Sequence, residues 1–337
     1  MSTFEDHSHE IELLTSVKPY VIGLCVMEHS ALFGIVDARG DVLCSESVPM
    51  SDYPEPTAFV FDICDRLLPM IEKCGGLERI KAMGISACSG NNRNGCIENP
   101  SNLKWGGKIP LAKMFQGSLA IPVSLLNDAT AAAMGEMTFG AAHGLQNFVA
   151  VSVNVGLGAG IFVNNRAVLG YNGRVGEIGH VTIFPGGRAC GCGKEGCLES
   201  YVSRRGIIDN LFELFKTYPE LTSTLRQVKK EDMTIDMIVE AAEAGDVVAT
   251  KVLNYSGELL GKALVPVASF INPEAFVLCG EVGTKCGRFM QRAILEALNV
   301  NLFSQMKWQT RVLLSSLDLS EAPLLYASAE AWNTKAV

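Results

Sequence analysis

The stretch Ala189–Glu199 reads ACGCGKEGCLE and spaces three cysteines as Cys-x-Cys-x4-Cys, beginning ten residues after His180. Three thiolates and one imidazole make a complete tetrahedral ligand set for zinc. Because the protein fills all four positions, the pattern predicts a closed structural site without a catalytic water. The alternative is three buried free cysteines beside an unrelated histidine, but the spacing and the interleaved glycines favour zinc. The predicted ligands are His180, Cys190, Cys192 and Cys197.

Composition excludes several classes of protein. At 337 residues the chain is long for one core, which predicts two lobes. A net charge of -8 without a basic run argues against direct binding of nucleic acid or of an anionic membrane surface. The first twenty residues lack the apolar core of a signal peptide, and no apolar stretch is long enough to span a membrane. Eleven cysteines without an export signal indicate reduced thiols plus a metal site, so we expect a cytoplasmic protein.

Hydrophobic periodicity predicts alternating strands and helices, hence a layered α/β fold. A set of three strands followed by helices begins at Tyr20 and again at Phe148, which suggests two related halves. The expected divisions are a leader at 1–19, an N-terminal lobe at 20–145 and a C-terminal lobe at 146–337. The last two elements expected are a strand at 275–279 and a helix at 287–298.

Polar residues beside these elements suggest a ligand site. Asn127 and Asp128 stand between a predicted strand and a predicted helix, where a carboxylate is either an N-cap or a base that takes a proton from a hydroxyl. Several amide and carboxylate acceptors around one cavity suit a polyhydroxylated ligand. The candidate sugar-binding residues are Asn102, Asn127, Asp128, Glu177, His180 and Glu199.

Three segments resemble the repressor/ORF/kinase (ROK) family: 126–136 (LNDATAAAMGE), 176–180 (GEIGH) and the cysteine run that ends at Glu199. The resemblance covers about residues 20–331 and implies a two-domain actin/hexokinase-like (ribonuclease H-like) fold with a sugar in the interdomain cleft. It implies that Asp128 is the base that activates a sugar hydroxyl in the kinases. It also implies that the other five candidates contact sugar hydroxyls, and that His180 binds zinc as well. The family contains ATP-dependent sugar kinases and sugar-sensing repressors, and its members are frequently dimers.

The loops that match the ATP site of the family's kinases are altered. Where those kinases have Asp-x-Gly-Gly-Thr-Lys, residues 25–30 read CVMEHS, without either glycine and with Glu28 near the expected phosphates. The second loop, 154–160, reads NVGLGAG and has Val155 in place of a hydroxyl. The adenosine-side turn has Glu281 in place of its second glycine. The glycines retained in this degraded ATP site are Gly156, Gly158, Gly160 and Gly280.

Two functions therefore remain open. We favour a sugar-sensing, regulator-type domain that binds a hexose or amino-hexose, contains structural zinc and transfers phosphate poorly if at all. The alternative is a glucokinase-like hexose kinase that uses Mg-ATP with Asp128 as base. A third interpretation, an inactive structural relative, does not account for the retained polar set. Only about twenty residues precede the first strand, too few for a DNA-binding headpiece, so direct DNA binding is not expected. We expect a homodimer or a higher oligomer.

Overall fold

The computed structural model describes residues 18–100 and 103–333, which form two compact units. The first unit contains the described residues up to Phe139, Leu169–Arg174 and the described residues from Ser320 onward. The second contains Gly140–Val168 and Val175–Leu319. This division differs from the predicted lobes, because the C-terminal helix belongs to the first unit. Most of the predicted leader, and the candidate Asn102, lie outside the described residues.

Strands and helices both contribute fully buried aliphatic residues to the cores of the two units. The bounds of the strands are β1 Tyr20–Val26, β2 Ser30–Asp37, β3 Val42–Pro49, β4 Ile80–Ala87, β5 Gly90–Asn91, β6 Cys96–Glu98, β7 Lys108–Ile109, β8 Val123–Asn127, β9 Phe148–Val153, β10 Leu157–Val163, β11 Arg166–Ala167, β12 Ala275–Cys279 and β13 Arg311–Leu314.

The helices connect and cover these strands. Their bounds are α2 Pro56–Lys73, α3 Leu111–Leu119, α4 Asp128–Thr138, α5 Glu199–Val202, α6 Arg204–Thr217, α7 Ile235–Glu243, α8 Val247–Ile271, α9 Gly280–Asn301 and α10 Ala322–Asn333. None of the helices in the described ranges is both long enough and apolar enough to cross a bilayer.

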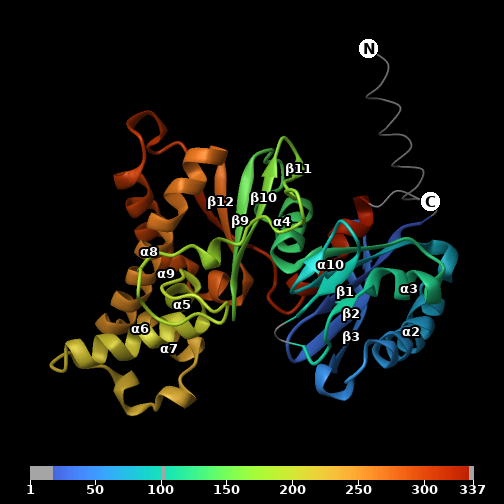
Figure 1. Cartoon of the computed structure of the whole chain (residues 1–337), viewed down its shortest axis with the longest axis horizontal. Helices are drawn as coiled ribbons and strands as arrows, with labels where there is room; N and C mark the ends of the chain where they lie inside the picture. Colours follow the sequence, from blue (N-terminus) through green and yellow to red (C-terminus); the bar gives the residue numbers. More distant parts are fainter. Residues whose placement is uncertain (1–17, 101–102, 334–337) are drawn as a thin grey trace. The chain divides into compact units, whose positions relative to one another are not determined.

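The first unit is built on a five-stranded sheet in the order β3-β2-β1-β4-β8. β1, β2 and β3 form an antiparallel meander, and β4 and β8 run parallel to β1. Helices α2 and α3 pack on one face, and α10 and α4 lie on the other (Figure 1). The carboxyl end of β8 leads directly into α4, so Asn127 and Asp128 stand at that junction.

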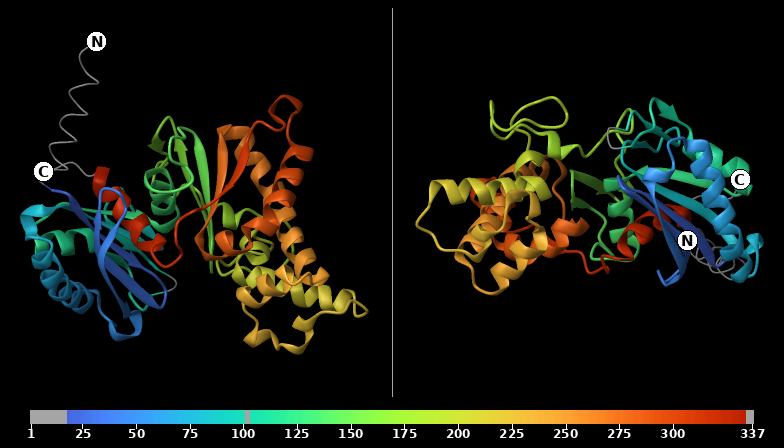
Figure 2. Two further views of the ribbon diagram at one scale, coloured as in Figure 1. Left: turned by 180° about the vertical axis from the view of Figure 1, so that it is seen from behind. Right: turned by 90° about the horizontal axis from the view of Figure 1, so that it is seen from below.

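The second unit repeats this plan with the sheet β11-β10-β9-β12-β13. Its first three strands are again antiparallel, and β12 and β13 run parallel to β9. The long helices α8 and α9 lie side by side in both views of Figure 2 and share one core with β9, β10 and β12. The predicted repeat of three strands and helices is confirmed.

Candidate functional site

The junction between β8 and α4 holds two polar side chains of the first unit. The Oδ1 atoms of Asn127 and Asp128 both accept the backbone N–H of Ala129, at 3.0 and 2.9 Å. Asn127 is therefore the N-cap of α4, while Asp128 is its first residue and is exposed. The positive end of the helix dipole favours the ionised carboxylate there. An exposed carboxylate in this position can accept a proton from a bound hydroxyl.

The Asp128 carboxylate also affects a buried thiol near the end of β1. Burial, followed by the nearby Asp128 carboxylate, raises the pKa of the Cys25 thiol to about 12. Cys25 and Val26 are the last residues of β1, and the turn to β2 consists of Met27, Glu28 and His29 alone. Its Glu28 carboxylate lies 3.9 Å from Nε2 of the exposed His29. This turn offers an acidic side chain and no glycine, as the sequence indicated.

A second carboxylate of the first unit, Glu98, was missed by sequence reasoning. Its Oε2 accepts from Nδ2 of Asn91 at 3.1 Å and its Oε1 from Nδ2 of Asn94 at 2.8 Å. Arg174 lies 3.1 Å from the same carboxylate and Lys108 lies 3.4 Å from it. Glu98 thus fixes the segment that leads toward position 102. The only signal in the sequence is the number of asparagines in segment 91–99, whose side chains can donate hydrogen bonds to a carboxylate.

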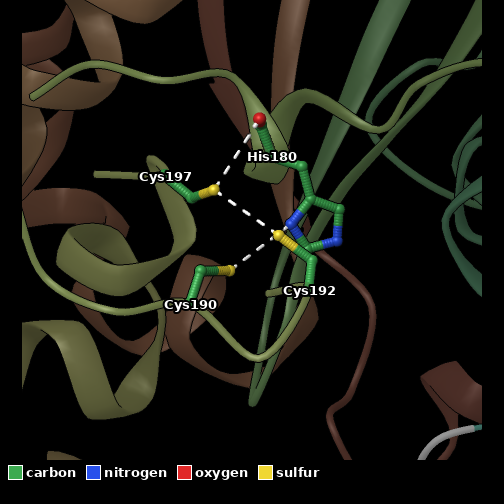
Figure 3. A group of neighbouring side chains, drawn as sticks. All are labelled: His180, Cys190, Cys192 and Cys197. Atoms are coloured by element: carbon green, nitrogen blue, oxygen red, sulfur yellow. Dashed lines mark hydrogen bonds between the residues drawn. The ribbon is translucent and has the colours of Figure 1, made fainter. Parts of the chain in front are cut away.

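The predicted metal ligands of the second unit do come together. One ligand atom from each of His180, Cys190, Cys192 and Cys197 lies within 4.8 Å of every other (Figure 3). Nδ1 of His180 lies 3.7 Å from Sγ of Cys190, and Sγ of Cys192 lies 3.7 Å from Sγ of Cys197. The loop between them is closed by backbone hydrogen bonds from Cys190 to Lys194 and from Gly193 back to Cys190.

These separations fit a tetrahedral zinc site. With Zn–S bonds of about 2.3 Å, tetrahedral geometry places two sulfurs roughly 3.8 Å apart. The separation of 3.7 Å between the Sγ atoms of Cys192 and Cys197 matches that value. A hydrogen bond from the backbone N–H of Lys194 lowers the pKa of Cys192, which favours the thiolate needed for metal binding. The donor set is therefore suited to zinc in number, type and spacing.

Two carboxylates lie next to this cluster. With Nδ1 of His180 directed at Cys190, its Nε2 lies 4.0 Å from Oε2 of Glu177, whose side chain is 53% exposed. Glu199 begins α5, and its Oε2 accepts the backbone N–H of Leu157 at 3.0 Å. Its Oε1 lies 3.9 Å from Sγ of Cys190. The second unit thus brings Glu177 and Glu199 beside His180 and the other candidate metal ligands.

The glycine-rich segment 154–160 is only partly a loop. Gly158 and Gly160 lie in β10 and pair with Ser152 and Ala150 of β9, so Gly156 alone lies in the turn. Asn154 Oδ1 accepts the backbone N–H of Glu281 at 2.7 Å, which ties this turn to the start of α9. Gly280 precedes that contact with φ +76°, and a Cβ there would lie 2.7 Å from the Asn154 amide.

Ion pairs surround the first turn of α9. The Glu281 carboxylate contacts the Arg204 guanidinium and lies 3.1 Å from Nζ of Lys285. Nζ of Lys285 also lies 2.6 Å from Asp236, and that carboxylate is the main cause of the raised pKa of Lys285. The side chain that replaces a glycine in the sequence is therefore held by two cations at a helix N-terminus.

Comparisons with known proteins agree with this architecture. The model of the ROK family matches residues 21–328. A glucokinase of Streptomyces coelicolor is 32% identical over 253 residues, which are 73% of this chain and 77% of the relative. The DNA-binding transcriptional dual regulator NagC of Escherichia coli is 28% identical over 315 residues, 91% of this chain and 75% of the relative.

Solved structures are similar over almost the full chain. The ROK family glucokinase from Streptomyces griseus, solved in complex with glucose and AMPPNP, is 28% identical with a TM-score of 0.78, covering 94% of this chain and 100% of that one. A ROK hexokinase from Thermus thermophilus is 26% identical with a TM-score of 0.75, covering 93% and 98%. The similarity includes both kinases and a regulator.

Proposed function

The chain belongs to the ROK family, and from this premise we propose that it is a hexose- or amino-hexose-binding protein of the regulator type. In this proposal its altered phosphate loops do not support efficient phosphoryl transfer. The relatives described above include a glucokinase solved with glucose and a transcriptional regulator, so the family alone leaves both outcomes open.

Each unit, taken by itself, offers polar side chains that we propose as sugar contacts. Asn127 and Asp128 offer an amide and an exposed carboxylate beside the first turn of α4. Glu177, His180 and Glu199 offer two carboxylates and the Nε2 atom of the imidazole. Carboxylates accept hydroxyl protons and amides both donate and accept, which is the pattern that a sugar with several adjacent hydroxyls requires. Asn102 belongs to the same proposed set.

We further propose that the four-residue cluster binds structural zinc. The ion would bridge His180 to the cysteine loop and so fix the imidazole, with Nε2 left for a ligand. Glu199 follows Cys197 by two residues, and its carboxylate already accepts the N–H of Leu157. Zinc would therefore stabilise the orientation of the proposed sugar-binding side chains without taking part in a reaction.

The ion pairs of Glu281 support the regulator interpretation most directly. Phosphoryl transfer needs positive groups that neutralise the charge of the nucleotide. Here the cations beside the turn that matches the adenosine side, Arg204 and Lys285, are already paired with Glu281. In the first unit, Glu28 adds another negative charge on the matching phosphate turn. Both features disfavour a bound triphosphate.

The second candidate is a hexose kinase, and one observation favours it. Asp128 retains the exposed position at the start of α4 that a general base for a sugar hydroxyl needs. In that case Mg-ATP is the phosphoryl donor, and Asp128 takes the proton of the attacking hydroxyl.

Calorimetry with a hexose panel, with and without Mg-ATP, tests the proposal together with an assay for ADP. We expect hexose binding with a Kd that Mg-ATP leaves unchanged, and no sugar-dependent ADP. Sugar-dependent ADP release that Asp128→Asn abolishes would establish the kinase instead. Failure to bind any hexose would contradict both candidates.

A matched variant sharpens the test. Glu281→Gly restores the second glycine of the turn and frees Arg204 from its ion pair, while Lys285 keeps its pair with Asp236. We expect it to raise the affinity for Mg-ATP by about tenfold or more, since charge-assisted contacts to phosphate become available. Unchanged nucleotide affinity would show that Glu281 does not block this site. Arg292→Gln, which removes an exposed pair with Glu296 farther along α9, serves as control.

A further inference from the structure

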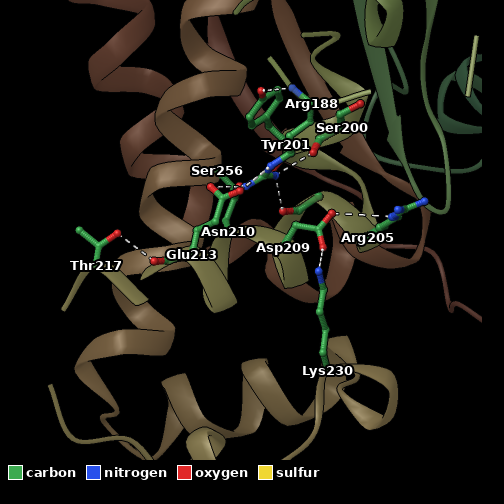
Figure 4. Close-up of polar contacts among 11 residues, drawn as sticks. Arg188, Ser200, Tyr201, Arg205, Asp209, Asn210, Glu213, Thr217, Lys230 and Ser256 are labelled. Carbon is green, nitrogen blue, oxygen red and sulfur yellow. Dashed lines mark hydrogen bonds and ion pairs between the residues drawn. The ribbon is translucent and has the colours of Figure 1, made fainter. Parts of the chain in front are cut away.

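Arg188 is a partly buried arginine two residues before Cys190, and its side chain is only 17% exposed. No motif in the sequence singles it out. It stands at the start of the segment 188–199, called the metal loop below, which contains the three cysteines and ends at Glu199. Figure 4 shows its guanidinium among groups from α5 and α6.

The guanidinium contacts four residues. Nε donates to Oε1 of Glu213 at 3.0 Å, and Nη2 lies 2.7 Å from Oε2 of the same carboxylate. Nη1 donates to the backbone carbonyl of Ser200 at 2.8 Å and to that of Gly206 at 3.3 Å. The guanidinium carbon also lies 4.4 Å from the centre of the Tyr201 ring. One side chain thus connects the metal loop to both α5 and α6.

The backbone of Arg188 closes the metal loop itself. Its N–H donates to the hydroxyl of Tyr201 at 2.9 Å, and its carbonyl accepts the N–H of Gly196 at 2.8 Å. Tyr201 is held in turn by Asn210, whose Nδ2 donates to the Tyr201 carbonyl at 2.7 Å and to Ser256 at 3.0 Å. The start of the loop is therefore anchored to the buried interior of the second unit.

We propose that Arg188 is a positioning residue that ties the metal loop, which contains Cys197, to α6 and to α5, which begins with Glu199. Ser200, whose carbonyl it binds, directly follows Glu199. A shift of α5 would move the Glu199 carboxylate away from Leu157 and would move Cys197 away from the other three ligands. The consequence for sugar rests on the function proposed above, whereas the consequence for the metal does not.

The planar fork of arginine is needed here, not merely its charge. Glu213 is 62% exposed, so its ion pair with Arg188 alone contributes little. The contacts that matter are those to the carbonyls of Ser200 and Gly206 and the stacking on Tyr201. A lysine ammonium keeps the charge but cannot reach all of these partners at once.

Arg226 provides a matched control in the same unit. Its guanidinium donates to the carbonyls of Leu221 at 2.8 Å, Tyr218 at 2.6 Å and Phe215 at 3.4 Å. It also lies 4.5 Å from the centre of the Phe215 ring. These contacts are of the same kind as those of Arg188, but their partners lie at 215–221, near the C-terminal end of α6.

The experiment compares zinc transfer from each variant to a chromogenic chelator, together with hexose Kd and Tm. We expect Arg188→Lys to weaken zinc retention by about tenfold or more, as is typical when a group that supports metal ligands is removed. Arg226→Lys should lower Tm to a similar degree and leave zinc retention within about twofold. Glu213→Gln should have an effect below about threefold, because its pair is largely exposed.

Equal effects of Arg188→Lys and Arg226→Lys on zinc retention would overturn the proposal. Should Arg188→Lys fail to fold, Tyr201→Leu decides the matter, because it removes the ring on which the Arg188 guanidinium stacks. We expect it to speed zinc release measurably, and unchanged release would count against the proposal. If the wild-type protein binds zinc but no hexose, the proposed function fails while the zinc comparison still tests Arg188.

Discussion

The two five-stranded sheets have the same strand order but achieve close packing in different ways. In the first unit, glycines of the central strands β1 and β4 lie beneath α10, which packs directly on them. A Cβ at Gly84 would lie 2.0 Å from the backbone oxygen of Ala327, and one at Gly23 would lie 2.8 Å from that of Leu324. In the second unit the strands β9 and β12 contain no glycine, and the glycines lie in α8. A Cβ at Gly261 would lie 2.5 Å from the oxygen of Ile294 in α9.

The two units differ in the sequence separation of the segments that pack closely together. The first sheet needs a helix from the C-terminal end, Ala322–Asn333, to cover β1 and β4. The close pair of the second unit, α8 and α9, is separated by one strand only. Because ordering distant segments costs more loop-closure entropy, the first unit should be the more sensitive to changes at its helix contact.

Alanine at each close contact gives the largest expected effect. Gly84→Ala should destabilise the protein by about 3 kcal/mol, since its Cβ meets backbone atoms that cannot move aside freely. Gly261→Ala should cost about 1–2 kcal/mol, because the contact is less severe and alanine favours the helix by about 1 kcal/mol. Urea unfolding measures both free energies.

Hydrogen exchange locates the two effects. Gly84→Ala should speed exchange in β1, β4 and α10, and Gly261→Ala in α8 and α9. Equal losses of stability, or faster exchange spread evenly over both units, would contradict the proposed difference between the two kinds of contact.

The burial pattern of each element decides whether it could be predicted from the sequence. Strands such as Tyr20–Val26 and the amphipathic helix Pro56–Lys73 follow from periodicity, because each buries one face or one continuous apolar run. Helix α10 was missed since almost all of its sides are buried, which removes the helical pattern. The sequence predicts a helix that starts at Gly287, whereas α9 starts at Gly280, because glycines in the first turns resemble helix breakers. Gly287 in fact makes room for Leu314.

The candidate site also contains residues that could be predicted from the sequence and residues that could not. The cluster of His180 with three cysteines could be predicted, because the ligands are close in sequence and their spacing is diagnostic. The roles of Arg188 and Glu98 could not be predicted, because tertiary packing determines which residues they contact. Arg188 contacts positions 200, 206 and 213, and no local pattern records that arrangement.

Removing one buried hydrogen bond from each unit should give a smaller loss of stability and also compares the two units. In the first unit the Tyr326 hydroxyl donates to Oε1 of the fully buried Glu136 at 2.8 Å. Tyr326→Phe should cost about 2 kcal/mol, because a buried charged or polar acceptor loses a donor. In the second unit, Ser256→Ala should cost about 1 kcal/mol, since Asn210 keeps its bond to the Tyr201 carbonyl. Urea unfolding at pH 7 measures both, and a larger loss for Ser256→Ala would reverse the expected order.

The smallest expected effect concerns one carboxylate in each unit. Hydrogen bonds from Asn91 and Asn94, with the nearby Lys108, lower the pKa of Glu98 to about 2 from an ordinary value of 4.5. Because the folded pKa is the lower one, the stabilisation is complete above about pH 4.5 and is lost as pH falls toward 2. After allowance for screening by water, Glu98→Gln should cost about 1 kcal/mol at pH 7. The difference from wild type should shrink progressively below pH 4.5.

In the second unit, Glu274 is the carboxylate to compare with Glu98, because its pKa is also lowered. Backbone N–H groups of Asn147 and Gln146 lower its pKa, each donating at 2.9 Å. Glu274→Gln should therefore show a pH dependence of the same sign. Its main partners are backbone groups, with smaller contributions from the Asn147 side chain and the charge of Arg311. Glu98 forms ion pairs with both Lys108 and Arg174, so high salt should reduce the Glu98 effect more than the Glu274 effect. Urea unfolding between pH 3 and 7 at two salt concentrations measures this. A pH-independent loss in Glu98→Gln would mean that its carboxylate acts by shape alone.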